Sequence, residues 1–276
     1  MTSTDFVSGF EFDRMSRRPL YEASIGHLIG HCQIRPDSTV VDLGCGSGAV
    51  TQRILDRFPA LNMRICAIEP SEAELKIARS RISDRRVTFL HARAQEALQS
   101  VQNGDVVLLS NVIHQIPLPE RHAVCEAAFQ LLKPGGRFVV STLFYEGAVH
   151  PGTQRFYFQW MRAAHSHLQS KGAQLQLPKE KPPSLQLCSV QEYGAMLSQA
   201  GFRDVLVDEQ VVQWRVEDWK ALSTYSVFIR GALGPNVDLR LGSEALVMGV
   251  SRVFQELGWS EMSRGWVYIA GNKPSA

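Results

Sequence analysis

The chain has 276 residues, of which 45% are hydrophobic and 20% are charged, with a formal net charge of +2. This predicts a globular protein with a full core, as one enlarged domain or a domain with an appended lobe. No run of about 18 apolar residues and no basic-then-apolar leader is present, so we expect no membrane segment and a cytoplasmic location. The small net charge argues against a nucleic-acid partner, and the scattered cysteines argue against disulfides or a zinc site.

From Thr39 onward, short apolar runs alternate with amphipathic segments. Strands are expected at 39–43, 64–68, 87–91, 105–110 and 137–142, and helices at 49–57, 71–82, 95–101 and 119–132. This alternation implies a parallel sheet with right-handed crossovers and helices on both faces. The predicted fold class is therefore doubly wound α/β, in which ligands bind at the carboxyl ends of the strands near the switch in strand order.

Beyond Tyr145 the alternation changes. The aromatic-rich segment 156–168 is expected to form a helix, and a polar, proline-bearing loop follows it, as in a lid. A helix at 190–200 and strands at 205–212 and 266–271 complete the chain, with helical segments inserted between the two strands.

The segment VVDLGCGSGAV, residues 40–50, lies where the first strand ends. Gly44, Gly46 and Gly48 allow a tight turn and a close approach by a ligand. The lysine of a phosphate-binding Walker loop is missing, and the spacing differs from the G-x-G-x-x-G of dinucleotide sites. Asp42 would repel a pyrophosphate but suits an ammonium or sulfonium group.

Glu69 ends the second strand, 21 residues after Gly48. An acidic residue in this place can accept hydrogen bonds from both hydroxyls of an unphosphorylated ribose. Adenosine with a cationic amino-acid tail satisfies Glu69 and Asp42 together, which describes S-adenosylmethionine.

Four segments in order, VVDLGCGSG, CAIEPS, DVVLLSNVIHQI and LLKPGGRFVVS, carry a wider resemblance. With them the chain resembles the class I S-adenosylmethionine-dependent methyltransferases, especially the small-molecule branch that includes the ubiquinone and menaquinone biosynthesis type. The resemblance covers roughly residues 36–201 and the last two strands. It implies a Rossmann-like seven-stranded sheet whose last two strands form a reversed hairpin, with helical lid insertions.

The resemblance also implies roles for single residues. Those expected to bind the cofactor are Asp42, Gly44, Cys45, Gly46 and Gly48 at the methionine end and ribose, Glu69 at the ribose hydroxyls, Pro70 at the adenine and Asn111 at the methionine. The third strand departs from the family pattern, because Arg93 precedes Ala94 where the family often has an acidic residue. Adenine recognition there would fall to backbone groups such as the Ala94 N–H, with Arg93 as a further candidate.

The acceptor side offers fewer signals. His114 is the candidate general base, since a histidine titrates near neutral pH, and the alternative is a histidine packed at the rim of the pocket. Tyr145, Phe156 and Trp160 are candidate substrate contacts, although an aromatic stripe at helical spacing is also typical of core packing. In the family an N-terminal helical arm closes over the cofactor, and here Arg18 and Tyr21 are its candidates; no metal is expected.

We therefore divide the chain into an N-terminal helical arm (1–35), a cofactor-binding Rossmann-like core (36–145), a helical lid (146–189) and the remaining core (190–276), which has an insertion at about 213–264. The expected function is methyl transfer from S-adenosylmethionine to a small, partly hydrophobic acceptor at oxygen, nitrogen or carbon. A cofactor-retaining cyclase or isomerase is the main alternative, and an RNA or DNA methyltransferase a weaker one. The oligomeric state is open, with a homodimer compatible with the sequence.

Overall fold

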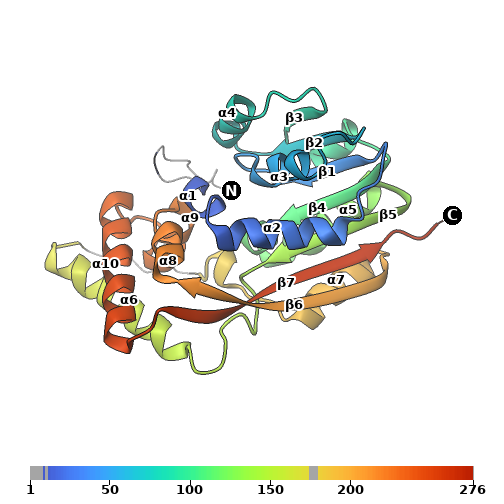
Figure 1. The fold of residues 1–276 in the computed structure, drawn as a ribbon. Coiled ribbons are helices and arrows are strands. Elements are labelled where there is room, and N and C mark those ends of the chain that lie inside the picture. Colours follow the sequence, from blue (N-terminus) through green and yellow to red (C-terminus); the bar gives the residue numbers. More distant parts are fainter. Residues whose placement is uncertain (1–8, 10–11, 174–179, 276) are drawn as a thin grey trace.

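The computed structural model describes residues 9, 12–173 and 180–275 (Figure 1). In this part of the chain a seven-stranded sheet has the order β3-β2-β1-β4-β5-β7-β6, and β7 runs antiparallel to both neighbours. The strands are β1 (Thr39–Leu43), β2 (Arg64–Glu69), β3 (Val87–His91), β4 (Gly104–Ser110), β5 (Leu132–Thr142), β6 (Arg203–Arg215) and β7 (Glu261–Asn272). The expected doubly wound Rossmann-like fold with a reversed last hairpin is confirmed.

Helices cover both faces of this sheet. The helices are α1 (Asp13–Ser16), α2 (Pro19–Cys32), α3 (Ala49–Arg57), α4 (Glu72–Arg81), α5 (Arg121–Leu131), α6 (Gln154–Ser170), α7 (Val190–Gln199), α8 (Val216–Leu222), α9 (Ser226–Leu233) and α10 (Leu239–Leu257). Successive strand residues point to opposite faces. Val40 accordingly joins the buried cluster under α2 and α3, whereas Val41 joins the cluster under α5 and α7.

A separate helical layer lies beyond the end of the sheet and contains α6, α8 and α10 (Figure 1). The Trp160 indole N–H donates to the Leu246 carbonyl at 2.8 Å, and Gly249 lets the two helices approach, since a Cβ atom there would lie 3.1 Å from the Trp160 ring. The segments expected as two insertions, 146–189 and 213–264, thus pack against each other. The expected arm and lid include residues 1–8, 10–11 and 174–179, which lie outside the described residues.

Several strand boundaries differ from those expected. β5 begins at Leu132 rather than at Arg137, because Leu132 pairs with Gly104 before a register shift brings Arg137 opposite Val106. β6 and β7 extend past their predicted ends and pair as far as Arg215 opposite Glu261. Of the helices that the structure describes, none combines the length and apolar character needed to cross a membrane.

Candidate cofactor site and adjoining pocket

The glycine loop joins β1 to α3 with three residues in the left-handed region. Gly44, Gly46 and Gly48 have φ angles of +70°, +52° and +86°. A Cβ atom at Gly44 would lie 2.6 Å from Val112, and one at Gly48 would lie 2.8 Å from Ile82, so packing within the protein requires these two glycines. A Cβ atom at Gly46 would meet nothing within 4 Å, so this is where the loop leaves room for a ligand.

Asp42 lies in β1, directly before this loop, and is 1% exposed. Its Oδ2 atom accepts a hydrogen bond from the Thr51 hydroxyl at 2.7 Å, whereas its Oδ1 atom is buried and accepts from none of the described residues. Burial raises the pKa of Asp42 to about 7, against the Thr51 hydrogen bond and with a further contribution from the charge of Glu69. A buried carboxylate with one unpaired oxygen is a site for a cation.

Glu69 ends β2, the strand paired with β1, and its carboxylate is tied to the backbone. The Gly46 N–H donates to Oε2 at 3.0 Å, and the Ser71 N–H donates to Oε1 at 2.9 Å. Burial raises the pKa of Glu69, and these two hydrogen bonds oppose that rise. Each carboxylate oxygen can accept a second hydrogen bond, so the group is held in place and can still receive hydroxyls.

Asn111 follows β4 with φ +53°, and Val112 after it packs against Gly44. Its Oδ1 atom accepts from the Leu143 N–H at 3.1 Å, whereas its Nδ2 atom is buried and meets no geometrically acceptable hydrogen-bond partner among the described residues. Tyr21 of α2 lies beside Asn111: burial raises the pKa of its hydroxyl, and the side chains of Asn111 and Ser110 oppose that rise. Arg18 instead pairs with Asp218 at 2.7 Å.

The residues expected around the adenine lie at the ends of β2 and β3. Pro70 and Arg93 are exposed, and Ala94 is half-buried. The Arg93 N–H donates to Glu96 at 2.8 Å and is therefore already paired. Cys45, in the glycine loop, is 6% exposed, and burial raises the pKa of its thiol, which suits a structural rather than a reactive role.

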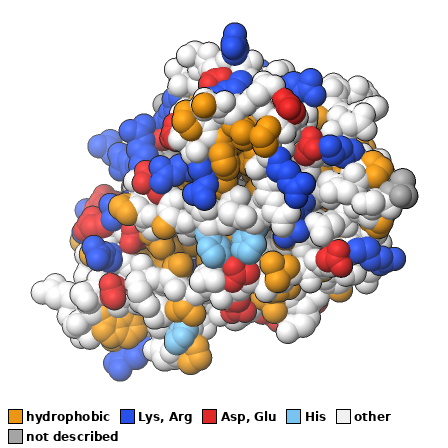
Figure 2. Space-filling model, turned by 45° about the vertical axis from the view of Figure 1, so that its right-hand side comes forward, with side chains coloured by type: hydrophobic (Ala, Val, Ile, Leu, Met, Phe, Trp, Pro, Cys, Tyr) orange, Lys and Arg blue, Asp and Glu red, His pale blue; other side chains and the backbone are white. Residues whose placement is uncertain are grey.

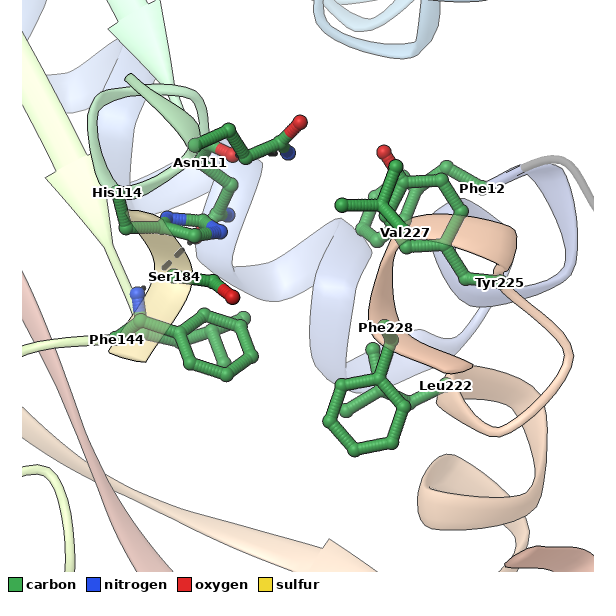
Figure 3. A pocket seen from close by; sticks show the side chains of 11 residues that line it. Phe12, Asn111, His114, Phe144, Ser184, Leu222, Tyr225, Val227 and Phe228 are labelled. Carbon is green, nitrogen blue, oxygen red and sulfur yellow. Dashed lines mark hydrogen bonds between the residues drawn. The ribbon is translucent and has the colours of Figure 1, made fainter. Parts of the chain in front are cut away.

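A pocket adjoins this end of the sheet (Figure 3). The figure shows His114 and Asn111 on one wall and Tyr225, Phe12 and Val227 on the other. Its lining residues are Phe12, Asn111, His114, Gln115, Leu143, Phe144, Ser184, Leu222, Tyr225, Val227 and Phe228. Most are aromatic or aliphatic, so the pocket suits a ligand with hydrophobic surface.

His114 is 5% exposed, and its Nδ1 atom lies 3.0 Å from the Thr142 hydroxyl oxygen. Burial, together with the charges of Arg121 and Arg264, lowers the pKa of His114 to about 3. The imidazole is therefore neutral at physiological pH and a weak base. Its place on the pocket wall agrees with the expected location, but its role as a base stays a prediction.

This depressed pKa leads to a stability prediction. The unfolded chain binds a proton at His114 below about pH 6.5 and the folded protein does not, so His114 lowers stability on acidification, by about 2 kcal/mol between pH 8 and pH 5. We expect His114→Gln to remove this contribution, so that on acidification from pH 8 to pH 5 the variant gains about 2 kcal/mol relative to the wild type, measured by urea unfolding at both pH values. An imidazole NMR signal of His114 that titrates near pH 6.5 in the folded protein would contradict the prediction.

The three expected substrate contacts do not line this pocket. The Tyr145 hydroxyl donates to Glu209 at 2.9 Å and lies against Gly265, where a Cβ atom would be 2.0 Å from it. Phe156 and Trp160 are at most 1% exposed, because the aromatic stripe of α6 packs onto α8 and α10. The pocket walls come instead from Phe144, one residue before Tyr145, and from the 222–228 segment, which no motif singles out.

Arg121 is another residue that the sequence did not indicate. Its guanidinium is fully buried at the start of α5 and makes no ion pair with any described residue. It donates to the backbone carbonyls of Ile116, Gln186, His114 and Pro183 and to the Cys188 sulfur. It thus ties the short helix η4 (Pro183–Leu185), which includes the pocket residue Ser184, to the turn that carries His114.

Part of the chain is similar in sequence to known proteins, and the whole fold is similar to solved structures. Residues 40–136 match the family model described as "Methyltransferase domain". The chain is 33% identical over 122 residues to a carboxy-S-adenosyl-L-methionine synthase of Shewanella amazonensis, covering 43% of this chain and 49%, about half, of that relative. The cyclopropane synthase MmaA2 of Mycobacterium tuberculosis shares the fold, with a TM-score of 0.60, 13% identity and coverage of 97% of this chain and 95% of that one.

The cyclase SpnF also shares the fold, with a TM-score of 0.56 and 16% identity over 93% of this chain and 82% of that one. At sequence identities this low, these two structures show a shared fold and nothing about activity. The methyltransferase-domain match covers β1 to the start of β5, the part that holds Asp42, the glycine loop, Glu69 and Asn111. Residues 40–136 of the chain therefore match a methyltransferase domain, and the chain has the fold of the class I methyltransferases.

Proposed function

We propose that this chain binds S-adenosylmethionine at Asp42, Glu69 and the loop around Gly46, and transfers its methyl group to a small, partly hydrophobic acceptor. The observation that carries the proposal is the position of Asn111. Its neighbour Val112 packs against Gly44 of the loop, and Asn111 itself lines the apolar pocket. A wall common to cofactor loop and acceptor pocket is what methyl transfer requires, because the two reactants must meet in line.

Two polar atoms support the fit of this cofactor. Buried polar groups almost always have hydrogen-bond partners, yet among the described residues neither the Asp42 Oδ1 acceptor nor the Asn111 Nδ2 donor has one. A ligand with a cationic amino-acid tail offers both a positive charge for Asp42 and acceptors for Asn111. The open space at Gly46, whose N–H is held by Glu69, gives a ribose room to approach that carboxylate.

Bound S-adenosylmethionine would supply a methyl group already activated by its positive sulfonium. The protein then has to orient the acceptor, exclude water and hold the two groups at reacting distance. Phe144, Tyr225 and Phe228 provide the apolar enclosure. His114 is neutral and weakly basic, so it can form a hydrogen bond with the methyl acceptor but is poorly suited to remove a proton from it. The pocket therefore favours direct methyl transfer to an acceptor that needs little deprotonation.

A second candidate is an enzyme that modifies the cofactor itself, as the name of the carboxy-S-adenosyl-L-methionine synthase relative describes. Arg264 favours it. This residue is 5% exposed, its guanidinium carbon lies 5.4 Å from the centre of the Phe144 ring, and it makes no ion pair with any described residue. It donates to the Leu143 carbonyl at 2.9 Å and to the Tyr157 hydroxyl, and its Nε atom has no hydrogen-bond partner among the described residues, so a ligand carboxylate that reached past Phe144 would supply the missing negative charge.

One experiment separates these functions and also the cyclase alternative. The protein is incubated with S-adenosylmethionine and a panel of small hydrophobic acids, phenols and amines, and the cofactor products are identified by mass spectrometry. S-adenosylhomocysteine in equal amount to a methylated acceptor supports methyl transfer. A carboxylated cofactor supports the second candidate, and an altered acceptor with unchanged cofactor supports a cyclase or isomerase.

Gly46→Ala tests the cofactor site directly. We expect it to weaken S-adenosylmethionine binding by at least about tenfold, because the new methyl group enters the space left for the ligand. The control is Gly152→Ala, where φ is +88° and a Cβ atom also meets nothing within 4 Å, but far from the loop in sequence. Both variants should lose about 1 kcal/mol of stability from the positive φ. Equal cofactor affinity in the two, measured by calorimetry, would refute the assignment of Gly46.

A further inference from the structure

We propose that His27, His31 and Asp208 form a binding site for a divalent transition-metal ion such as Zn²⁺, away from the cofactor loop. The two histidine Nε2 atoms lie 2.6 Å and 2.9 Å from one and the same oxygen, Oδ2 of Asp208. All three potential ligand atoms lie within 4.8 Å of one another. Among the described residues, no other three histidine, cysteine or carboxylate side chains bring their ligand atoms this close together.

The fold brings the three residues together from distant parts of the chain. His27 and His31 are four residues apart on α2, so they share one face of that helix. Asp208 lies on β6, the edge strand, opposite Tyr268 of β7. The Tyr268 ring packs under both imidazoles, at centroid distances of 4.6 Å and 5.8 Å, and so limits their rotation.

A second residue orients the carboxylate. The Gln210 amide donates to Oδ1 of Asp208 at 2.5 Å, which leaves Oδ2 directed at the histidines. The carboxylate thus has the outer hydrogen bond that metal ligands usually have.

The donor set and the access to solvent select the class of metal. Two imidazole nitrogens and one carboxylate oxygen suit zinc and its first-row neighbours rather than magnesium or calcium. In a tetrahedral zinc site the ligand atoms are about 3.3 Å apart, so each histidine would retreat from the oxygen by less than about 1 Å. The side chains are 41%, 17% and 24% exposed, which leaves an entry path and room for a fourth ligand. A surface pair of histidines above an acidic group is visible in Figure 2.

An ion here would fix α2 to the edge of the sheet. The same helix carries Tyr21 beside Asn111, so the metal would hold the helix that reaches the cofactor end of the strands. The alternative is an ordinary hydrogen-bonded cluster that links α2 to β6 without metal. The two readings differ in one measurable property, which is the affinity for the ion.

The test uses the full chain after treatment with a chelator. Zn²⁺ is titrated by calorimetry and Co²⁺ by visible absorption, and we expect one ion per chain and the absorption bands of a protein-bound Co²⁺. His31→Gln and Asp208→Asn should each lower the affinity at least about 100-fold, because each removes a direct ligand. His167→Gln is the matched control, since His167 pairs with Glu244 at 3.0 Å in a cluster with a single histidine, and it should bind as the wild type does.

The wild-type protein alone gives a second readout that does not depend on how the variants fold. In a long-range ¹H–¹⁵N NMR spectrum, Zn²⁺ should shift the Nε2 signals of two histidines and leave the others in place. Absence of Zn²⁺ binding by the wild type would overturn the proposal. Binding that persists undiminished in both ligand variants, or that moves other histidine signals, would also overturn it.

Discussion

Replacing Asp42 with asparagine will weaken S-adenosylmethionine binding and at the same time stabilise the ligand-free protein at pH 8. Asp42 provides the buried negative charge, and loss of a hydrogen bond to a charged ligand costs about 1.5–3 kcal/mol, or about 10- to 150-fold in affinity. The same charge is unfavourable without a ligand, because Oδ1 has no partner and burial raises the pKa to about 7.

The sign of the stability effect follows from this pKa. The pKa of Asp42 in the folded protein lies above the unfolded value of 3.8. Protonation of Asp42 therefore stabilises the folded protein fully below about pH 4, and this stabilisation is lost as the pH rises through 7. At pH 8 the ionised group costs up to about 4 kcal/mol. The asparagine amide would itself lack a hydrogen-bond partner, which costs about 1 kcal/mol. We therefore expect Asp42→Asn to raise the free energy of unfolding at pH 8 by about 1–3 kcal/mol.

Acidification changes the stability of the protein in opposite directions through Asp42 and His114. Between pH 8 and pH 5 the wild type gains about 2–3 kcal/mol from Asp42 and loses about 2 kcal/mol from His114, so the two effects nearly cancel. Asp42→Asn should therefore become less stable on acidification and His114→Gln more stable. Urea unfolding at the two pH values measures both trends.

The matched control for Asp42 is Asp56→Asn, which removes an exposed carboxylate of α3 that accepts only from Gln52. It should change neither cofactor affinity nor stability by more than about 0.5 kcal/mol. Asp42→Asn with unchanged affinity for S-adenosylmethionine would remove Asp42 from the site, and loss of stability at pH 8 would show that its carboxylate is paired in solution.

Replacing Arg121 with methionine will destabilise the protein by about 3–5 kcal/mol, because the buried guanidinium donates hydrogen bonds to several carbonyls of the connected turns. Methionine fills much of the volume but leaves the carbonyls of Ile116, Gln186 and Pro183 without that donor. Lysine should rescue little, because a single ammonium cannot reproduce the planar fork of the guanidinium. Urea unfolding at pH 7.5 measures the change.

The control for this prediction is Arg252→Met, in which an arginine 69% exposed on α10 loses only its pair with Glu256. It should change stability by less than about 0.5 kcal/mol. Folded Arg121→Met should keep its affinity for S-adenosylmethionine, since Arg121 contacts neither Asp42 nor Glu69, but lose affinity for acceptors as η4 shifts. A stability loss below about 1 kcal/mol would mean that water or other donors replace the guanidinium.

Local sequence patterns predict the sheet, the glycine loop and the two acidic residues of the proposed cofactor site. Asp42, Gly46 and Glu69 lie within two consecutive strand–helix units, and in a parallel sheet the ends of neighbouring strands meet at one edge. Their proximity therefore follows from local patterns together with the rule for right-handed crossovers. No long-range packing has to be known.

The walls of the proposed acceptor pocket, in contrast, depend on packing between distant segments, which no local pattern reveals. Phe144 and Tyr145 are adjacent and both aromatic, yet one lines the pocket and the other points toward Glu209. The stripe with Phe156 and Trp160 has the same helical period whether it covers a ligand or another helix, and its partner proved to be α10.

The surroundings of the buried charged and titratable side chains also depend on the tertiary structure. The sequence around Arg121 and His114 does not indicate that they are buried, and the carbonyls around Arg121 come from turns up to 65 positions away. Likewise, the spacing of His27 and His31 fixes a shared helix face, but only the pairing of β6 with β7 brings Asp208 to that face. The hydrophobic period and the strand order determine at which end of the sheet a ligand binds. The side chains that meet at that end depend on contacts between segments far apart in the chain.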